Sequence, residues 1–194
     1  YMETGNFFLA REYLEKTQAI CREQSNARIE SLNLCNLARI DFYEDKYEEA
    51  LKKIDQAYPV FKNIDSYPDL YRCELILLDI YRKNDNFENA IESVTKAKEY
   101  SEKIGNSNNE FLCSFLLEVI NYQSGILDDL SKIERLKKDL PEEDEIKAVF
   151  YYELWKISSG KKKDQYASVS LEIYEKLNDT KPKYEYDQRI KELN

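Results

Sequence analysis

The feature that most constrains the fold of this 194-residue chain is a repeat with a spacing of 40 residues. Turn residues recur at this spacing, and each precedes an aromatic or apolar residue by two positions. The turn residues are Gly5, Asp45, Asp85 and Gly125, followed by Phe7, Tyr47, Phe87 and Leu127. Three positions later the register holds Ala10, Ala50, Ala90 and Leu130. Further apolar or small residues follow at spacings of three and four in the first three repeats, which places them on one face of a helix.

The segment before each turn carries a second helical pattern in the same register. Its equivalent positions are Leu37, Leu77 and Leu117, and Ile40, Ile80 and Ile120. Each repeat is therefore predicted to contain two antiparallel helices, and the small side chains of Ala50 and Ala90 allow the helix axes to approach closely. The pattern weakens in the last repeat, where Glu134 and Lys137 stand at positions that are apolar or small in earlier repeats.

Start and stop signals agree with this register. The predicted helices cover residues 6–22, 27–43, 47–64, 67–83, 86–104, 107–124, 126–139, 142–159, 164–178 and 182–193. Gly105, Gly125 and Gly160 each follow a helical run, as C-terminal caps do. Pro59 lies inside a predicted helix and indicates a kink or an early end. The stretch 160–163 departs from the repeat spacing and predicts a longer loop.

These patterns predict an all-α fold, a right-handed α-α superhelix of about ten helices in a single domain over residues 1–194. The repeats cover roughly residues 1–25, 26–65, 66–105, 106–140 and 141–179, and a closing helix covers 180–194. The first repeat lacks its first helix, because Tyr1–Thr4 would be the last turn before Gly5. We therefore expect further sequence upstream of Tyr1.

Composition narrows the range of functions. The chain has no histidine, which removes the commonest general base and metal ligand. Its net charge of -9 disfavours binding of nucleic acid, and no apolar run is long enough to span a membrane. The sequence therefore predicts a non-enzymatic protein without a cofactor or a metal ion.

The four cysteines form no metal-binding or redox motif. Cys21, Cys35, Cys73 and Cys113 include no CxxC pair, so a zinc site would need all four thiolates to converge from distant helices. We interpret them as small buried residues of a cytoplasmic protein. Their even number leaves an exported, disulfide-bonded protein as the alternative.

Two segments resemble tetratricopeptide repeats. They are residues 36–51, Asn-Leu-Ala-Arg-Ile-Asp-Phe-Tyr-Glu-Asp-Lys-Tyr-Glu-Glu-Ala-Leu, and residues 84–91, Asn-Asp-Asn-Phe-Glu-Asn-Ala-Ile. The 40-residue period is similar to that of the extended subclass found in kinesin light chains and in bacterial regulators of the Rap/PlcR kind. The resemblance covers residues 1 to about 140 well and about 141–194 loosely.

The resemblance implies a concave face lined by the first helix of each pair, where asparagine side chains hold peptide backbones. Asn36 stands at the position of such an asparagine. The predicted partner-binding residues are Asn36, Arg39, Tyr43, Arg72, Asp79, Arg82, Lys83 and Tyr122. Beside them, residues 112–119 would form an apolar shelf, so that the surface suits an extended peptide with an acidic group. The alternatives are that the charged residues form an ordinary solvated helix face and that the shelf is buried against the last helix.

The leading functional prediction is a superhelix that binds a protein or peptide, as the sensing or scaffold part of a larger regulator. Residues 170–179 and the helix after them resemble the C-terminal helices of bacterial transcriptional regulators, which would place a DNA-binding part upstream. The alternative is a regulatory subunit or assembly scaffold that binds a folded partner protein and no peptide. The sequence leaves a homodimer open.

Overall fold

The computed structural model describes residues 2–23 and 26–194, and within these ranges the chain forms ten α-helices and one 3-10 helix. The helices are α1 (Phe7–Glu23), α2 (Ala27–Tyr43), α3 (Tyr47–Asn63), α4 (Tyr67–Lys83), α5 (Phe87–Ile104), α6 (Ser107–Gln123), α7 (Leu130–Arg135), η1 (Leu136–Asp139), α8 (Asp144–Ile157), α9 (Gly160–Thr180) and α10 (Tyr184–Leu193). The predicted all-α fold of about ten helices is confirmed. Tyr1, which begins the predicted partial turn, and residues 24–25, which end the predicted first repeat, lie outside the described residues.

Three local predictions differ from the structure in part or in full. Of the two outcomes expected at Pro59, the early end does not occur, since α3 continues to Asn63 with Ala57 and Phe61 fully enclosed on its buried face. The loop expected over 160–163 is the first turn of α9, and Gly160 does not cap α8, since the extended backbones of Ser158 and Ser159 already separate the two helices. The helix expected over 126–139 is reduced to α7 and η1.

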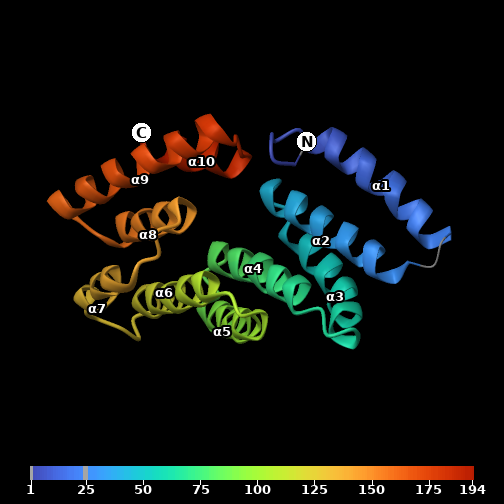
Figure 1. Cartoon of the computed structure of the whole chain (residues 1–194), viewed down its shortest axis with the longest axis horizontal. Coiled ribbons are helices and arrows are strands. Elements are labelled where there is room, and N and C mark those ends of the chain that lie inside the picture. Colours follow the sequence, from blue (N-terminus) through green and yellow to red (C-terminus); the bar gives the residue numbers. More distant parts are fainter. Residues whose placement is uncertain (1, 24–25) are drawn as a thin grey trace. The chain divides into compact units, whose positions relative to one another are not determined.

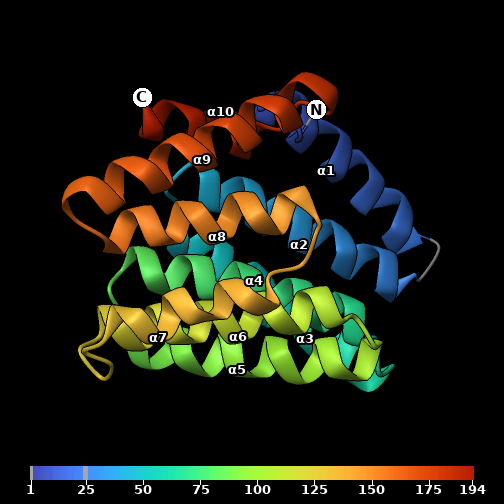
Figure 2. The same cartoon turned by 60° about the vertical axis from the view of Figure 1, so that its left-hand side comes forward.

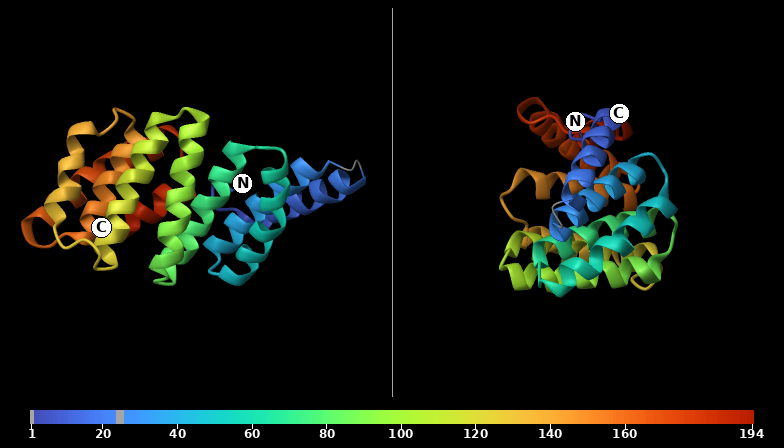
Figure 3. Two further views of the ribbon diagram at one scale, coloured as in Figure 1. Left: turned by 90° about the horizontal axis from the view of Figure 1, so that it is seen from below. Right: turned by 90° about the vertical axis from the view of Figure 1, so that its right-hand side faces the viewer.

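The described chain divides into two compact units. Unit 1 contains Met2 and residues 6–106, and unit 2 contains residues 3–5 and 107–194. In unit 1, α2 pairs with α3 and α4 pairs with α5 as antiparallel hairpins, and α1 packs on α2 (Figure 1). Figure 3 shows the same two hairpins, coloured from light blue to green, from two further directions.

The core of unit 1 is built from small residues alternating with large ones. Ala50 and Ala90, the predicted close-packing positions, are fully buried, and so are Ala57 and Ala97. The main core cluster contains Cys35, Ala38, Ala50, Ile54, Ala57, Phe61, Leu70, Cys73, Ile76 and Ile80. It draws residues from α2, α3 and α4, so one cluster joins consecutive hairpins.

The turns between helices repeat one backbone conformation. Asp45, Asp65 and Asp85 have φ values of 58°, 49° and 52°, and Gly105 continues the 20-residue spacing with a φ of 73°. A left-handed residue ends each helix by turning the chain sharply, and aspartate is among the few non-glycine residues that adopt this conformation readily. The sequence repeat of 40 therefore contains two equivalent turns.

Unit 2 packs α8 between α6 and α9, and α10 lies along α9 (Figure 2). Its core is aromatic: Phe115 of α6 meets Phe150 of α8 with ring centroids 4.5 Å apart. Tyr152, Tyr174 and Tyr186 bring α8, α9 and α10 together. The abundant tyrosines of this region thus serve as packing residues.

All four cysteines are free and buried. Cys35 Sγ lies 3.4 Å from Cys73 Sγ, between α2 and α4, which is a thiol contact and not a disulfide bond. The contact with Cys35 and burial raise the pKa of the Cys73 thiol, so this side chain stays protonated. The prediction that the cysteines are buried residues is confirmed.

Replacement of Ala50 by Leu should destabilise the protein by about 1–3 kcal/mol, because the side chain has no room between α2 and α3. Urea unfolding followed by circular dichroism measures the change. Ala19→Leu on the exposed side of α1 is the control and should leave stability nearly unchanged. Equal stabilities for the two variants would contradict the assignment of Ala50 as a close-packing position.

Candidate protein-binding surface

The predicted binding residues of unit 1 lie on one face of α2 and on the equivalent face of α4. Arg72 and Lys83 are exposed, and the others are half-buried. We call this surface the α2/α4 face; it consists of Asn36, Arg39, Tyr43, Arg72, Asp79, Arg82 and Lys83. Tyr122 lies on α6 in unit 2 and is half-buried, so it is described apart from this face.

An ion pair joins the two helices of the α2/α4 face. Arg39 Nη1 lies 2.6 Å from Asp79 Oδ2, and both side chains are partly shielded from solvent. The two residues occupy equivalent positions in consecutive repeats. Arg39 is therefore engaged by a carboxylate of the same surface, and the solvent-facing cations of the face are Arg72 and Lys83.

Two other predicted residues have distinct surroundings. The Asn36 side chain is half-buried and makes no hydrogen bond with the described part of the chain. Its amide remains able to donate and accept, as a backbone-holding asparagine must. Tyr43 stacks on Phe7 of α1, with centroids 5.4 Å apart and ring planes 14° apart. Tyr43 thus also has a packing role between α1 and α2.

The apolar shelf expected on α6 is part of the core of unit 2. Phe115 and Val119 are fully buried, and Phe115 packs on Phe150 of α8. The interpretation of these residues as buried is the correct one, with α8 as the covering helix in place of the last helix. This face is closed to an extended ligand.

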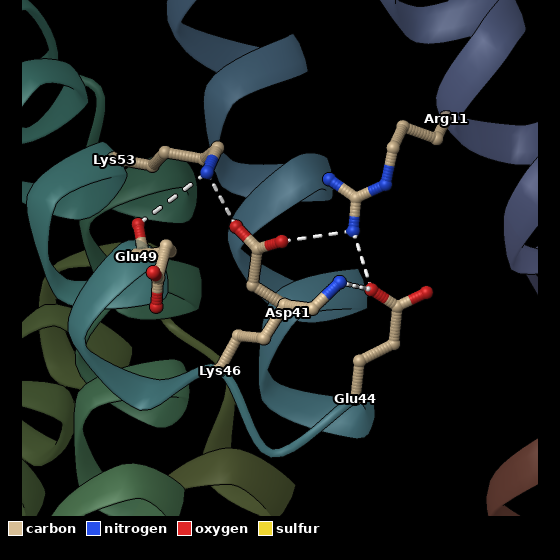
Figure 4. Close-up of polar contacts among 6 residues, drawn as sticks. All are labelled: Arg11, Asp41, Glu44, Lys46, Glu49 and Lys53. Carbon is tan, nitrogen blue, oxygen red and sulfur yellow. Dashed lines mark hydrogen bonds and ion pairs between the residues drawn. The ribbon is translucent and has the colours of Figure 1, made fainter.

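A network of charged side chains joins α1, α2 and α3 through Asp41 of α2. The Asp41 side chain is only 2% exposed, yet it meets two cations (Figure 4). Arg11 Nη2 of α1 lies 2.8 Å from Asp41 Oδ1, and Lys53 Nζ of α3 lies 2.5 Å from Asp41 Oδ2. The carboxylate thereby ties three consecutive helices together.

Glu44 extends the network to the surface at the end of α2. Its Oε2 lies 2.8 Å from Arg11 Nη2 and 2.7 Å from Lys46 Nζ (Figure 4). The hydrogen bond from Lys46, together with Arg11, lowers the pKa of the Glu44 carboxyl. Arg11 thus pairs with two carboxylates at once, that of the buried Asp41 and that of the partly exposed Glu44.

A second buried carboxyl group lies between α3, α4 and α5. Glu74 is 1% exposed and accepts a hydrogen bond of 2.7 Å from the Tyr58 hydroxyl, which is itself 2.9 Å from the Tyr100 hydroxyl. Burial raises the pKa of Glu74 despite these hydrogen bonds. A raised carboxyl pKa can mark a catalytic acid. Here the partners belong to three packed helices, so the arrangement fits a structural cross-link.

Residues 2–23 and 26–194 contain no cluster of three or more His, Cys, Asp or Glu side chains that could hold a metal ion. None of the helices found there combines the length and the apolar character that crossing a bilayer requires.

Hairpins of the tetratricopeptide kind, with a charged face on their first helices, define a helical-repeat scaffold. The cohesin loading factor family model matches residues 1–147, and the chain belongs to this family. The family consists of all-helical, non-catalytic scaffolds that bind protein partners. It is not the group of kinesin light chains or Rap/PlcR-type regulators, and the transcriptional-regulator interpretation gains no support. Among curated proteins and among solved structures, none matches the chain.

The charge network around Asp41 was missed by sequence reasoning. A signal was present, because Asp41 directly follows Leu37, Ala38 and Ile40 on the apolar side of α2. A carboxylate on such a face requires a cation or several hydrogen-bond donors. The partners themselves come from α1 and α3, and only the packing of the helices identifies them.

Proposed function

We propose that this chain is a scaffold of the cohesin loader complex that binds a folded partner protein through the α2/α4 face. The main support is the family match, which includes all of α1 to α7 and therefore the whole face. A nuclear site of action, on chromatin, follows from this proposal and replaces the expected cytoplasmic location.

The composition of the face favours a folded partner over an extended peptide. Arg39 is already neutralised by Asp79, and the apolar residues expected beside it are enclosed under α8. An extended peptide would thus find no apolar shelf for its side chains. A folded partner brings its own apolar surface, and arginine and tyrosine are residue types enriched where protein surfaces meet.

The double substitution Arg72→Glu and Lys83→Glu should weaken binding of the loader partner by at least about tenfold. Both side chains are exposed on the α2/α4 face, so their reversal places negative charge against the partner while leaving the core intact. Isothermal titration calorimetry with the purified partner subunit measures the dissociation constant. Circular dichroism verifies that the helices are retained.

A matched control carries the same change of charge elsewhere in unit 1. Lys52 and Lys62 are exposed on α3, and their replacement by Glu should leave the dissociation constant unchanged. Equal affinities for the Arg72/Lys83 variant and the wild-type chain would remove the α2/α4 face from the interface. If the wild-type chain does not bind the loader partner, the scaffold proposal itself fails.

A further inference from the structure

Unit 2 carries a patch of positive charge on a chain whose net charge is -9. Its residues come from α7, η1 and the first turn of α9. We call them the basic patch: Lys132, Arg135, Lys137, Lys138, Lys161, Lys162 and Lys163. Within residues 130–140 and 160–163 the acidic residues are Glu134 and Asp139. The net charge of the patch is therefore positive, whereas that of the whole chain is negative.

Glu134 joins the two parts of the patch. Its carboxylate oxygens lie 2.7 and 2.8 Å from Lys162 Nζ, and the Tyr166 hydroxyl donates a hydrogen bond of 2.8 Å to it. The hydrogen bond from Lys162 is the largest cause that lowers the pKa of Glu134, so the carboxylate stays ionised. The start of α9 is thereby held against α7, and basic residues far apart in the sequence come together.

The α7 and η1 part of the basic patch lines an open hollow of about 420 Å³. Ser131, Glu134, Arg135, Lys137 and Lys138 line it. Long basic side chains expose their methylene groups along such a wall while their charged ends remain in water. The hollow therefore offers apolar contact together with positive charge, a combination that suits a protein segment.

The patch is electrostatically unfavourable for the isolated chain. Lys161, Lys162 and Lys163 occupy the first turn of α9, where a helix end is already positive, and no acidic residue lies in that turn. Among the described residues, no carboxylate lies within ion-pair distance of Lys138 or Lys161. Glu134 balances Lys162, and the charges of Arg135 and Lys132 act on Asp129 at the start of α7. Lys138 and Lys161 therefore remain as cations of the patch without a carboxylate partner among the described residues.

We propose that the basic patch docks an acidic segment of a partner protein, with its carboxylates against the lysines and an apolar side chain in the hollow. The proposal rests on the proposed scaffold function but uses a different surface, in unit 2. An acidic protein segment is favoured over nucleic acid for two reasons. The net negative charge of the chain repels a few carboxylates less than a long polyanion, and the hollow accepts an apolar side chain, which nucleic acid lacks.

The test uses the whole chain and a fluorescein-labelled oligoglutamate peptide with a central leucine, followed by fluorescence anisotropy. Substitution of Lys138 and Lys161 by Glu should weaken binding by at least about tenfold at low salt. The Lys52→Glu and Lys62→Glu variant, with the same change of charge in unit 1, should bind the peptide as the wild-type chain does. The Arg72→Glu and Lys83→Glu variant should also bind it normally, which separates this test from that of the α2/α4 face.

Three results would overturn the proposal. The first is absence of peptide binding by the wild-type chain at low salt. The second is an equal loss in all three variants, which would show a response to total charge. The third is tighter binding of a short labelled DNA duplex than of the peptide, with the same dependence on Lys138 and Lys161, which would assign the patch to nucleic acid.

Discussion

Replacement of Phe61 by Ala is expected to lower the free energy of unfolding by about 3–5 kcal/mol. The Phe61 side chain is 0% exposed and belongs to the core cluster shared by α2, α3 and α4. Its removal eliminates apolar contacts and leaves a cavity that the packed helices cannot close without moving. Urea unfolding followed by circular dichroism measures the loss.

Phe8→Ala provides the matched control. Phe8 is 79% exposed on α1, so the same chemical change should alter stability by only a few tenths of a kcal/mol. Phe61→Leu, which retains most of the volume, should fall between the two. A loss for Phe61→Ala no larger than that for Phe8→Ala would show that the hairpins of unit 1 do not share this core.

Replacement of Asp41 by Ala should destabilise the chain by about 2–3 kcal/mol. The loss of the carboxylate leaves Arg11 and Lys53 close together, partly buried and without their shared anion. Their remaining exposure to water keeps the effect below that expected for fully buried charges. Thermal and urea unfolding near neutral pH measure it.

Asp41→Asn separates charge from shape, because it keeps the volume and one hydrogen-bond acceptor. We expect it to lose most of the same stability. Asp55→Ala on the exposed side of α3 should be nearly neutral. If Asp41→Ala unfolds at the same urea concentration as Asp55→Ala, the network does not hold α1, α2 and α3 together.

The helices of unit 1 could be predicted closely because their signals are local. Apolar positions at spacings of three and four, the small residues Ala50 and Ala90, and the turn residues Asp45 and Asp85 each act within a few neighbouring residues. Unit 2 was harder to predict because its later repeats lack these signals. The start of α9 at Gly160 depends on two extended serines that carry no periodic pattern.

Only part of the candidate site could be predicted from the sequence. The surface positions of Arg72 and Lys83 follow from helix periodicity. The pairing of Arg39 with Asp79 could also have been predicted, since the two residues are 40 positions apart and so equivalent in consecutive repeats. Burial of Phe115 was one of the alternatives, but its covering helix could not be predicted, because α8 returns over α6 from outside the regular repeat.

The short connections in unit 1 have a consequence for how quickly the chain folds. Tyr43 ends α2 and Tyr47 begins α3, so the two helices meet after closing a loop of very few residues. The same holds for α4 and α5, and most stabilising contacts of each hairpin are therefore close in sequence. Chains of this kind fold on timescales of microseconds to milliseconds. Formation can begin at either hairpin and extend to its neighbour, so no single helix pair has to form first.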